Sequence, residues 1–223
     1  MVEFTAQLSN LNQYAVGIYT NTPLSFPTTP KQVQAALKAI GVDGLRNSEV
    51  YIQDYTVTLP GLKPLLGEYA QIDELNYLAS RLQELTRDQR VTFAAAVSHG
   101  EYTGNLQDLI NLTYNLSCYH LLPHVRSYEE YGRHLVEVRS EFYLPKAATN
   151  YFDYAAYGED TAINEGGTMT VHGYIHNNQT PFRDVYDGKN IPEQYHVLRY
   201  PLQEKLMNRL KPHKEKAHDL PNR

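Results

Sequence analysis

The strongest hydrophobic periodicity of this chain lies in its middle and predicts helices there. Between Ile72 and Leu85, leucine and isoleucine recur at steps of three and four, with charged residues at the positions between them. This spacing puts apolar side chains on one face of an α-helix, which then packs against a core. Three more helices are predicted before Val138, each from a residue that can cap its first turn: Thr86, Asn105 and Ser127.

Strand patterns stand on both sides of these helices. On the amino-terminal side, three stretches rich in apolar or β-branched residues are predicted as strands: residues 3–9, 23–26 and 50–59. A helix is predicted between the second and the third, because Thr29 can cap it, Pro30 suits its first position and Gly41 can end it. This part of the chain therefore predicts a small ββαβ unit.

On the carboxyl-terminal side, a second α/β region is predicted after a short extended piece at residues 118–122. Asn150 can cap a short helix that runs through Tyr157 and stops at Gly158. Residues 168–175 alternate between apolar and polar side chains, which predicts one strand. The whole pattern predicts an α+β protein.

The predicted elements divide the chain into four parts. They are an amino-terminal ββαβ domain at residues 1–62, a central helical domain at 63–145, a carboxyl-terminal α/β domain at 146–182, and a basic extension at 183–223. In the extension the pattern weakens: one helix is expected at residues 202–210, and the last dozen residues are expected to be disordered.

The charges are unevenly distributed along the chain. Residues 1–182 carry 19 Asp and Glu against 11 Lys and Arg, whereas residues 183–223 carry 6 acidic and 9 basic residues. Three stretches of the first part contain carboxylates but no Lys or Arg: residues 65–80, 91–125 and 147–182. Such a surface repels nucleic acid and attracts proteins that bind it, although the solvated surface of an ordinary acidic protein has the same pattern.

Nine histidines raise the question of a metal site, and their spacing argues against one. His120 and His124 are four residues apart, but Pro123 disturbs the helix that would bring them together. His172 and His176 fall in the predicted strand, where the rise per residue separates them by about 13 Å, too far to share an ion. Surface or hydrogen-bonded histidines are the simpler interpretation.

Motifs for covalent or nucleotide chemistry are missing from the sequence. The single cysteine, Cys118, stands beside Tyr119 and His120, but neighbours on a strand point to opposite faces, so a core position is favoured over a nucleophile. There is no P-loop pattern. No signal peptide or apolar run of about 18 residues is found, so the chain is expected in the cytoplasm, with no disulfide, no cofactor and no membrane contact.

Two segments are specific enough to indicate a family: IDELNYL at residues 72–78 and NYFDYAAYGED at residues 150–160. They resemble the ArdA-type antirestriction proteins of conjugative plasmids and transposons. The opening SNLNQY at residues 9–14 and the closing GT and HG at 167–168 and 172–173 are similar to the same family. The order of α/β, helical and α/β regions also matches it.

The resemblance spans roughly residues 3–178 and implies a non-enzymatic inhibitor of type I restriction-modification enzymes. It implies an elongated homodimer whose carboxylates stand where DNA phosphates would, without binding nucleic acid itself. Duplex DNA carries one charge per about 1.7 Å of axis, so its binding groove is lined with Lys and Arg that such a protein can satisfy. The expected phosphate mimics are Glu68, Asp73, Glu74, Glu101, Asp108, Glu129, Glu130, Asp153, Glu159, Asp160 and Glu165. Those in residues 65–80 and 147–182 are expected to face outward.

The sequence departs from the family in two ways. Family members are more acidic, and here six arginines interrupt the helical region: Arg81, Arg87, Arg90, Arg126, Arg133 and Arg139. The basic extension has no counterpart, and it could bind DNA, fold back on the acidic body or be a dispensable tail. Two other functions stay open, namely an accessory module of a mobile element that touches nucleic acid through its tail and tyrosines, and a metal-independent hydrolase.

Overall fold

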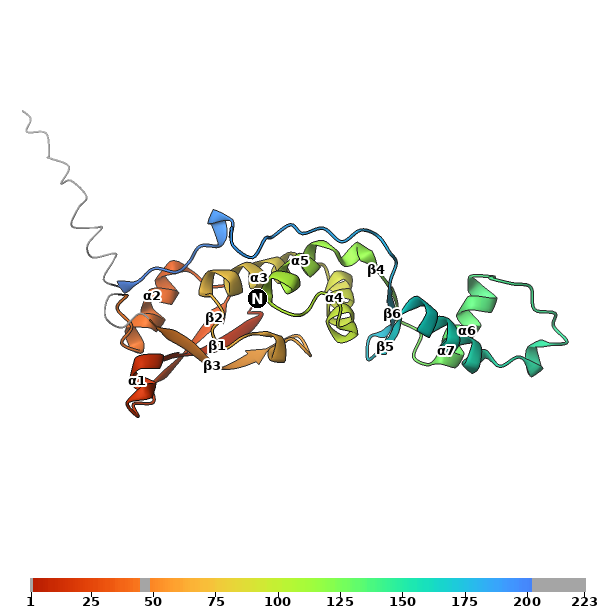
Figure 1. Ribbon diagram of the computed structural model, residues 1–223, viewed down its shortest axis with the longest axis horizontal. Helices are drawn as coiled ribbons and strands as arrows, with labels where there is room; N and C mark the ends of the chain where they lie inside the picture. The colour runs from red at the N-terminus through yellow and green to blue at the C-terminus, as the bar shows by residue number, and fades with distance from the viewer. Residues whose placement is uncertain (1, 45–48, 202–223) are drawn as a thin grey trace, which may run out of the picture.

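The computed structural model describes residues 2–44 and 49–201 (Figure 1). Within this part, seven α-helices and two three-stranded antiparallel sheets follow one another along an elongated molecule. The predicted α+β class is confirmed. The helix predicted at residues 202–210 and the disorder predicted for the last dozen residues lie outside the described residues. No helix in the described ranges combines the length and the apolar character that crossing a membrane requires.

The first sheet forms as predicted. Its order is β2-β1-β3, all antiparallel: β1 (Phe4–Asn10), β2 (Asn21–Phe26) and β3 (Val50–Val57). Alternate residues of β1 point into the core, and Phe4, Ala6 and Leu8 are fully buried. A short helix, α1 (Leu11–Ala15), occupies the turn after β1. The helix α2 (Pro30–Ala39) packs against β2, and its predicted cap residue Thr29 forms a capping box with Gln32.

The central helices also follow the sequence pattern. They are α3 (Ile72–Glu84), α4 (Arg87–His99) and α5 (Leu106–Tyr114). Thr86, the predicted cap, forms a capping box with Gln89, and Gly100 ends α4 in the left-handed conformation at φ 95°. The side chain of Asn105 accepts a hydrogen bond from the first turn of α5, as expected of a cap.

The second sheet has the order β4-β6-β5, and it corrects one prediction. β4 (Tyr119–Leu122) lies where an extended piece was predicted, but residues 168–175 are two strands, β5 (Thr168–Thr170) and β6 (Gly173–Asn177). The alternation is interrupted because Gly173 takes φ 125° in a tight turn, where a Cβ would lie 2.3 Å from the Leu122 carbonyl oxygen. Val171, expected on the same face as Met169, is at the tip of the turn and 76% exposed.

Two helices lie beyond this sheet and pack on each other. α6 (Tyr128–Arg133) continues into a π-helical stretch, His134–Val138, and α7 (Tyr154–Glu165) follows a loop. The prediction that Asn150 caps a helix stopped by Gly158 is wrong: Asp153 is the cap, and Gly166 ends the helix at φ 67°. Gly158 lies in the middle of α7. Only glycine fits there, because a Cβ would come within 2.0 Å of the Tyr128 carbonyl oxygen in α6.

The molecule therefore has two cores of very different size. One core joins the first sheet, α2 to α5 and the last described residues, and we call this part the body. The other contains five buried residues around α6 and α7, and we call residues 123–167 the lobe. The second sheet separates the two, since on β6 the neighbours Ile175 and Tyr174 belong to the body core and the lobe core respectively.

The domain boundaries predicted from sequence stay predictions, but their place in the structure is clear. The boundary after residue 62 falls inside the single core of the body, and the boundary after residue 145 falls between α6 and α7. Residues 178–201 run back from the second sheet along α5 and α3 toward α2 (Figure 1). For residues 183–201, the structure thus shows the folded-back alternative for the basic extension.

Candidate partner-binding surface

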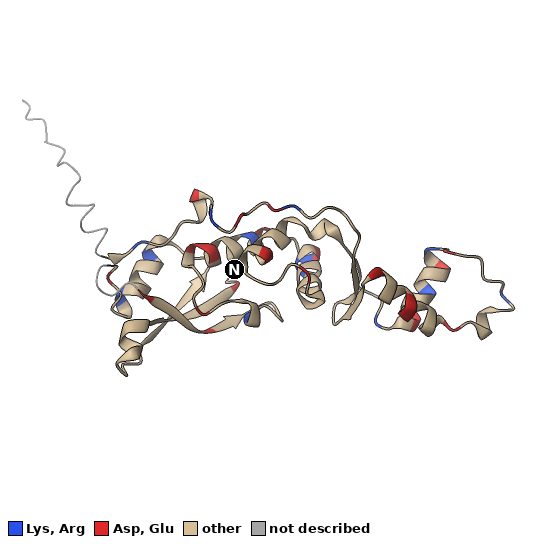
Figure 2. Cartoon of the chain, viewed as in Figure 1, with Lys and Arg blue, Asp and Glu red and all other residues tan. Residues whose placement is uncertain are grey.

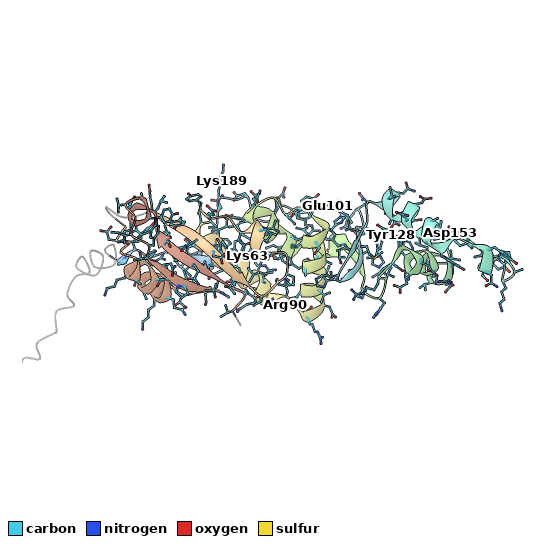
Figure 3. All side chains as sticks on the ribbon, turned by 90° about the horizontal axis from the view of Figure 1, so that it is seen from below. Lys63, Arg90, Glu101, Tyr128, Asp153 and Lys189 are labelled. Carbon is cyan, nitrogen blue, oxygen red and sulfur yellow. The ribbon has the colours of Figure 1, made fainter. Side chains whose placement is uncertain are left out.

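Most of the carboxylates expected to act as phosphate mimics are on the surface. Seven of the eleven are exposed: Glu68, Glu101, Glu129, Glu130, Asp153, Glu159 and Asp160. They are spread along the molecule instead of forming one cluster (Figure 2), with Glu101 near the middle and Asp153 in the lobe (Figure 3). The other four are partly buried, and the outward-facing expectation is wrong for Asp73, Glu74 and Glu165.

The outer face of α7 carries the carboxylates that have the fewest contacts within the chain. Because Gly158 holds the opposite face of the helix against α6, the next two residues, Glu159 and Asp160, point into solvent. Neither has an ion pair or a side-chain hydrogen bond with another described residue. Asp153 starts the helix by accepting a hydrogen bond from the Ala156 backbone at 3.0 Å, and it is exposed. The negative charge of Asp153 also suits the positive end of the helix dipole.

The carboxylates of α6 are more restrained. The hydroxyl of Ser127, the predicted cap, accepts from the Glu130 amide at 3.2 Å. The Glu130 carboxylate accepts from the Arg126 amide at 2.6 Å, so only half of a capping box forms. Glu129 accepts from the Arg133 guanidinium at 3.0 Å, and that guanidinium also stacks 4.4 Å above the Tyr154 ring. The guanidinium therefore neutralises part of this surface.

Glu165 does not face outward, because it is the centre of a hydrogen-bond network in the lobe core. Its carboxylate accepts from the Tyr131 hydroxyl at 2.5 Å and the Tyr174 hydroxyl at 3.1 Å, and lies 2.7 Å from His176 Nδ1. Burial alone would raise the pKa of Glu165, but these hydrogen bonds and His176 bring it below its ordinary value. Its charge thus serves the fold of the lobe.

Asp73 and Glu74, at the start of α3, are covered by the returning carboxyl-terminal segment. One Asp73 oxygen accepts from the amides of Val197 and Leu198, both at 2.7 Å, and its other oxygen lies 3.2 Å from His196. Burial raises the pKa of Glu74 above its ordinary value, and a hydrogen bond from Tyr186 partly offsets this. Both carboxylates are therefore engaged within the chain.

The remaining three carboxylates lie on the body. Glu68 is exposed and has no side-chain partner among the described residues. Glu101 is exposed at the end of α4, where it accepts from Asn177 at 2.9 Å and lies 3.6 Å from His99 Nε2. Asp108 accepts from the Gly104 amide at 3.0 Å, which closes the turn before α5. Glu68 and Glu101 remain available to a partner.

The arginines that interrupt the acidic surface are mostly paired with carboxylates of the chain. Arg90 reaches the buried carboxylate of Glu3 at 2.6 Å, Arg81 bonds Glu84, and Arg139 contacts Glu141 at 3.1 Å. Arg139 also lies 3.4 Å from Glu165. Each of these arginines is therefore paired within the chain and presents little free positive charge to a partner.

Sequence reasoning missed several exposed carboxylates of the same kind. Asp54, Asp88, Glu137 and Glu141 are also exposed. Asp88, Glu137 and Glu141 lie within two residues of an arginine, so a search for stretches without cations did not select them, whereas Asp54 lies in a cation-free stretch, residues 47–62, that the search passed over. Helical spacing could have found Glu137, because it lies four residues after Arg133 and pairs with it at 3.6 Å. Sequence windows identify net charge better than they identify individual exposed groups.

The histidine and cysteine interpretations can be placed as well. The pairing of β4 with β6 sets His120 opposite His176, with ring centroids 5.4 Å apart, and His172 lies in the turn that precedes β6. Within the described ranges, no three His, Cys, Asp or Glu side chains are arranged to hold a metal. Cys118 is buried, as predicted, and burial raises the pKa of its thiol.

Comparison with known proteins agrees with the resemblance seen in the sequence. No curated protein matches the chain. The family model of the antirestriction protein ArdA matches residues 7–176, which cover most of the body and the whole lobe. The chain therefore belongs to the ArdA antirestriction protein family.

Proposed function

We propose that this protein blocks type I restriction-modification enzymes by imitating duplex DNA, without catalysing a reaction. The observation that carries the proposal is an elongated molecule with exposed carboxylates along its length (Figure 2). A DNA-binding groove presents Lys and Arg to a polyanion, and releasing counterions from both surfaces favours the complex. A protein offers such a groove no base to methylate and no phosphodiester to cut. The target acts on DNA inside the cell, so the cytoplasm is the proposed location.

The lobe is the part best suited to this role. It carries eight Asp and Glu against four Lys and Arg, and the unpaired side chains of Glu159 and Asp160 lie on its outer face. Asp153 and Asp160 are seven residues apart on one helix, so they lie on the same face, about 10 Å apart along the axis. Glu101 and Glu68 continue the negative surface along the body.

We further propose a homodimer, because one chain offers too few carboxylates to match a long stretch of DNA phosphates. The far end of the lobe is the proposed contact with a second copy. Val138, Tyr143 and Tyr151 are 69%, 87% and 89% exposed there, and a cavity of about 450 Å³ lined partly by Val136 and Phe142 opens beside them. Exposed apolar side chains concentrated in one short segment, residues 138–151, are candidates for a protein contact.

The proposal is tested by displacement of labelled target DNA from a purified type I restriction-modification enzyme. The triple variant Asp153→Asn, Glu159→Gln, Asp160→Asn should bind more weakly than wild type and lower the slope of log K against log salt by about one or more. The control variant Lys146→Gln, which makes the lobe more negative, should bind as well or better. Unchanged displacement by the triple variant would contradict mimicry.

Two further measurements distinguish the proposed inhibitor from the accessory module and from the hydrolase. Labelled DNA mixed with the protein alone should stay free, and direct binding would favour the accessory module that touches nucleic acid. Inhibition should require stoichiometric protein, whereas a hydrolase would act at a small fraction of the enzyme concentration.

The proposed homodimer is tested by light scattering, which should give the mass of a dimer. The double variant Tyr143→Ser, Tyr151→Ser should shift the protein to monomer, whereas Tyr69→Ser, at an exposed tyrosine of the body, should leave the dimer unchanged.

A further inference from the structure

The described carboxyl-terminal segment is bound to the body in the way that a peptide is bound to a receptor. Residues 183–192 have no helix or strand, and only a single turn of 3₁₀ helix, Glu193–Tyr195, follows. Their backbone is instead held by side chains of α3 and α5. The family match ends at residue 176, so the segment lies wholly outside the part of the chain that defines the family. We call residues 183–198 the strap.

Two asparagines of α5 bond both the amides and the carbonyls of the strap. Asn111 accepts from the amides of Val185 and Tyr186 at 2.9 and 2.8 Å and donates to the Tyr186 carbonyl at 2.9 Å. Asn115, one helical turn later, accepts from the Arg183 amide and donates to its carbonyl, both at 2.9 Å. Both asparagine side chains are almost fully buried, so the hydrogen-bonding atoms that they contribute are shielded from water.

Two residues of α3 continue the same row. Asn76 donates to the Tyr195 carbonyl at 3.1 Å, and Asp73 accepts from the amides of Val197 and Leu198 at 2.7 Å. The strap meets the row in order, from Asn115 and Asn111 to Asn76 and Asp73. Side chains that bond backbone groups hold an extended chain whatever its sequence, so this row supplies affinity and not selectivity.

Selectivity comes from two tyrosines of the strap, nine residues apart. Tyr195 stacks on Tyr77 of α3 at 4.2 Å between ring centroids, and Tyr186 meets the same ring edge-on at 5.4 Å. Both are buried, with 3% and 7% of their surface exposed for Tyr186 and Tyr195. The strap residues between them, including Asp187 and Lys189, are mostly exposed, so the side chains of these residues contribute little to selectivity.

We propose that the face formed by α3 and α5 is a binding site for an extended peptide with two aromatic anchors, and that the strap is its built-in, exchangeable ligand. The row of Asp73, Asn76, Asn111 and Asn115 binds the peptide backbone, and Tyr77 binds both anchors. The same segment of a second copy, or a synthetic peptide of that sequence, fits the site equally well. The inference does not depend on the proposed inhibition of restriction enzymes.

The test begins with the full chain carrying a protease site between Thr180 and Pro181. Both residues are exposed, and the insertion precedes the stack of Phe182 on Tyr102 and the first hydrogen bond of the strap, at Arg183, so it leaves the strap's own hydrogen bonds intact. After cleavage, the fragment from Pro181 onward should co-elute with the rest of the chain in native gel filtration. A labelled peptide of residues 181–201 should then replace it. Release of the fragment from a chain whose circular dichroism is unchanged, or unfolding on cleavage, would overturn the proposal.

Variants distinguish the row from the anchors. Asn111→Ala should weaken the labelled peptide at least tenfold, because three hydrogen bonds are lost, whereas Asn164→Ala, at an exposed position on α7, should leave binding unchanged. A peptide with Tyr186→Ala and Tyr195→Ala should not compete. If this peptide replaced the fragment as well as the unsubstituted peptide does, the two tyrosines would not contribute to selectivity.

A second measurement uses the wild-type chain and needs no cleavage. If the strap is a detachable ligand, the amides of Tyr186 and Val197 should exchange with solvent through a local opening, sooner than the amide of Leu78 in the same core. Added peptide should also produce a species with the chain's own strap displaced. Exchange of the strap amides only by global unfolding would mean that the strap is an ordinary part of the fold, and would overturn the inference.

Discussion

The body and the lobe are stabilised in different ways. The body buries 36 residues in one apolar core, to which the first sheet, four helices and the strap contribute. The lobe core contains only five residues, and the lobe relies on close backbone contact between α6 and α7 and on hydrogen bonds to Glu165. Loss of one contact removes a larger share of the stability of a small core held by a few specific contacts than of a large apolar core. The proposed partner surface is thus concentrated on the less redundant region.

The largest expected effect comes from the glycine contact between the two lobe helices. Gly158→Ala places a methyl group 2.0 Å from the Tyr128 carbonyl oxygen, and relief requires the helices to separate. We expect a cost of about 3 kcal/mol or more, as for severe overpacking, which unfolds the lobe while the body stays folded. Hydrogen exchange should show protection lost at Tyr131 but kept at Leu78.

The matched control is Gly67→Ala. Gly67 has a negative φ and nothing within 4 Å of the added Cβ, so its replacement should leave both regions intact. Equal stability of the Gly158→Ala lobe would show that the contact between α6 and α7 is looser than described.

The next effect tests whether the body has a weak point of its own. Arg90→Met removes the partner of Glu3, whose side chain is 1% exposed, and leaves a buried carboxylate without a counter-charge. We expect a loss of about 3 kcal/mol in the free energy of unfolding, measured by urea denaturation. Arg87→Met, at an exposed position on the same helix, should change stability by less than about 0.5 kcal/mol. A cost for Arg90→Met as small as that control would mean that the ion pair is dispensable.

How much of this organisation can be predicted from sequence depends on how local its causes are. The helices α3 and α4 follow from apolar spacing and from Thr86 with Gln89, which lie within one or two turns of each other. The place of Gly158 could not be predicted, because only contact with a distant helix makes glycine necessary there. The same holds for the strap, since a polar residue such as Asn111 gives no sign of a partner 75 residues away.

The candidate partner-binding surface also has some features that sequence could predict and others that it could not. Local sequence showed that Glu159 and Asp160 lie in a stretch without cations, and both are exposed. It could not show that Glu165, five residues later, turns inward to meet Tyr131 and His176. Exposure of a charged side chain depends on which face of a helix is covered, and that is decided by tertiary packing.

A third prediction concerns acid. The pKa of Glu165 is lower in the folded protein than its ordinary value of 4.5, so its ionised form stabilises the lobe above that pH, and the contribution is lost as pH falls through the folded pKa. Wild-type lobe protection should therefore decline as the pH falls below 4.5. Glu165→Gln should be less stable at pH 7 and should lose less as the pH falls.

The control for this titration is Glu159→Gln, on the exposed face of α7. It should leave the pH dependence of lobe protection unchanged, because Glu159 has no partner among the described residues. An acid profile that is the same for wild type and Glu165→Gln would place the titrating group elsewhere.

The smallest expected effect distinguishes the role of Asp153 as a helix cap from the role of its negative charge. Asp153→Asn keeps a side chain that can cap α7, so stability should change by less than about 0.5 kcal/mol, while Asp153→Ala loses the cap and about 1 kcal/mol. If the charge of Asp153 contributes to partner binding, both variants should weaken displacement of DNA to a similar, small degree. Weakening by Asp153→Ala alone would assign the effect to the helix and not to the charge.

The return of the strap also has a consequence for synthesis of the protein. Tyr186, Tyr195 and Val197 belong to the same core as Phe4, so the first strand and the last described residues must meet before that core is complete. At about 5–20 residues per second, a ribosome needs on the order of 10 s or more between them. Contacts so distant along the chain also form slowly. The body therefore reaches its final state only near the end of translation or after it, while α6 and α7 can associate on the nascent chain.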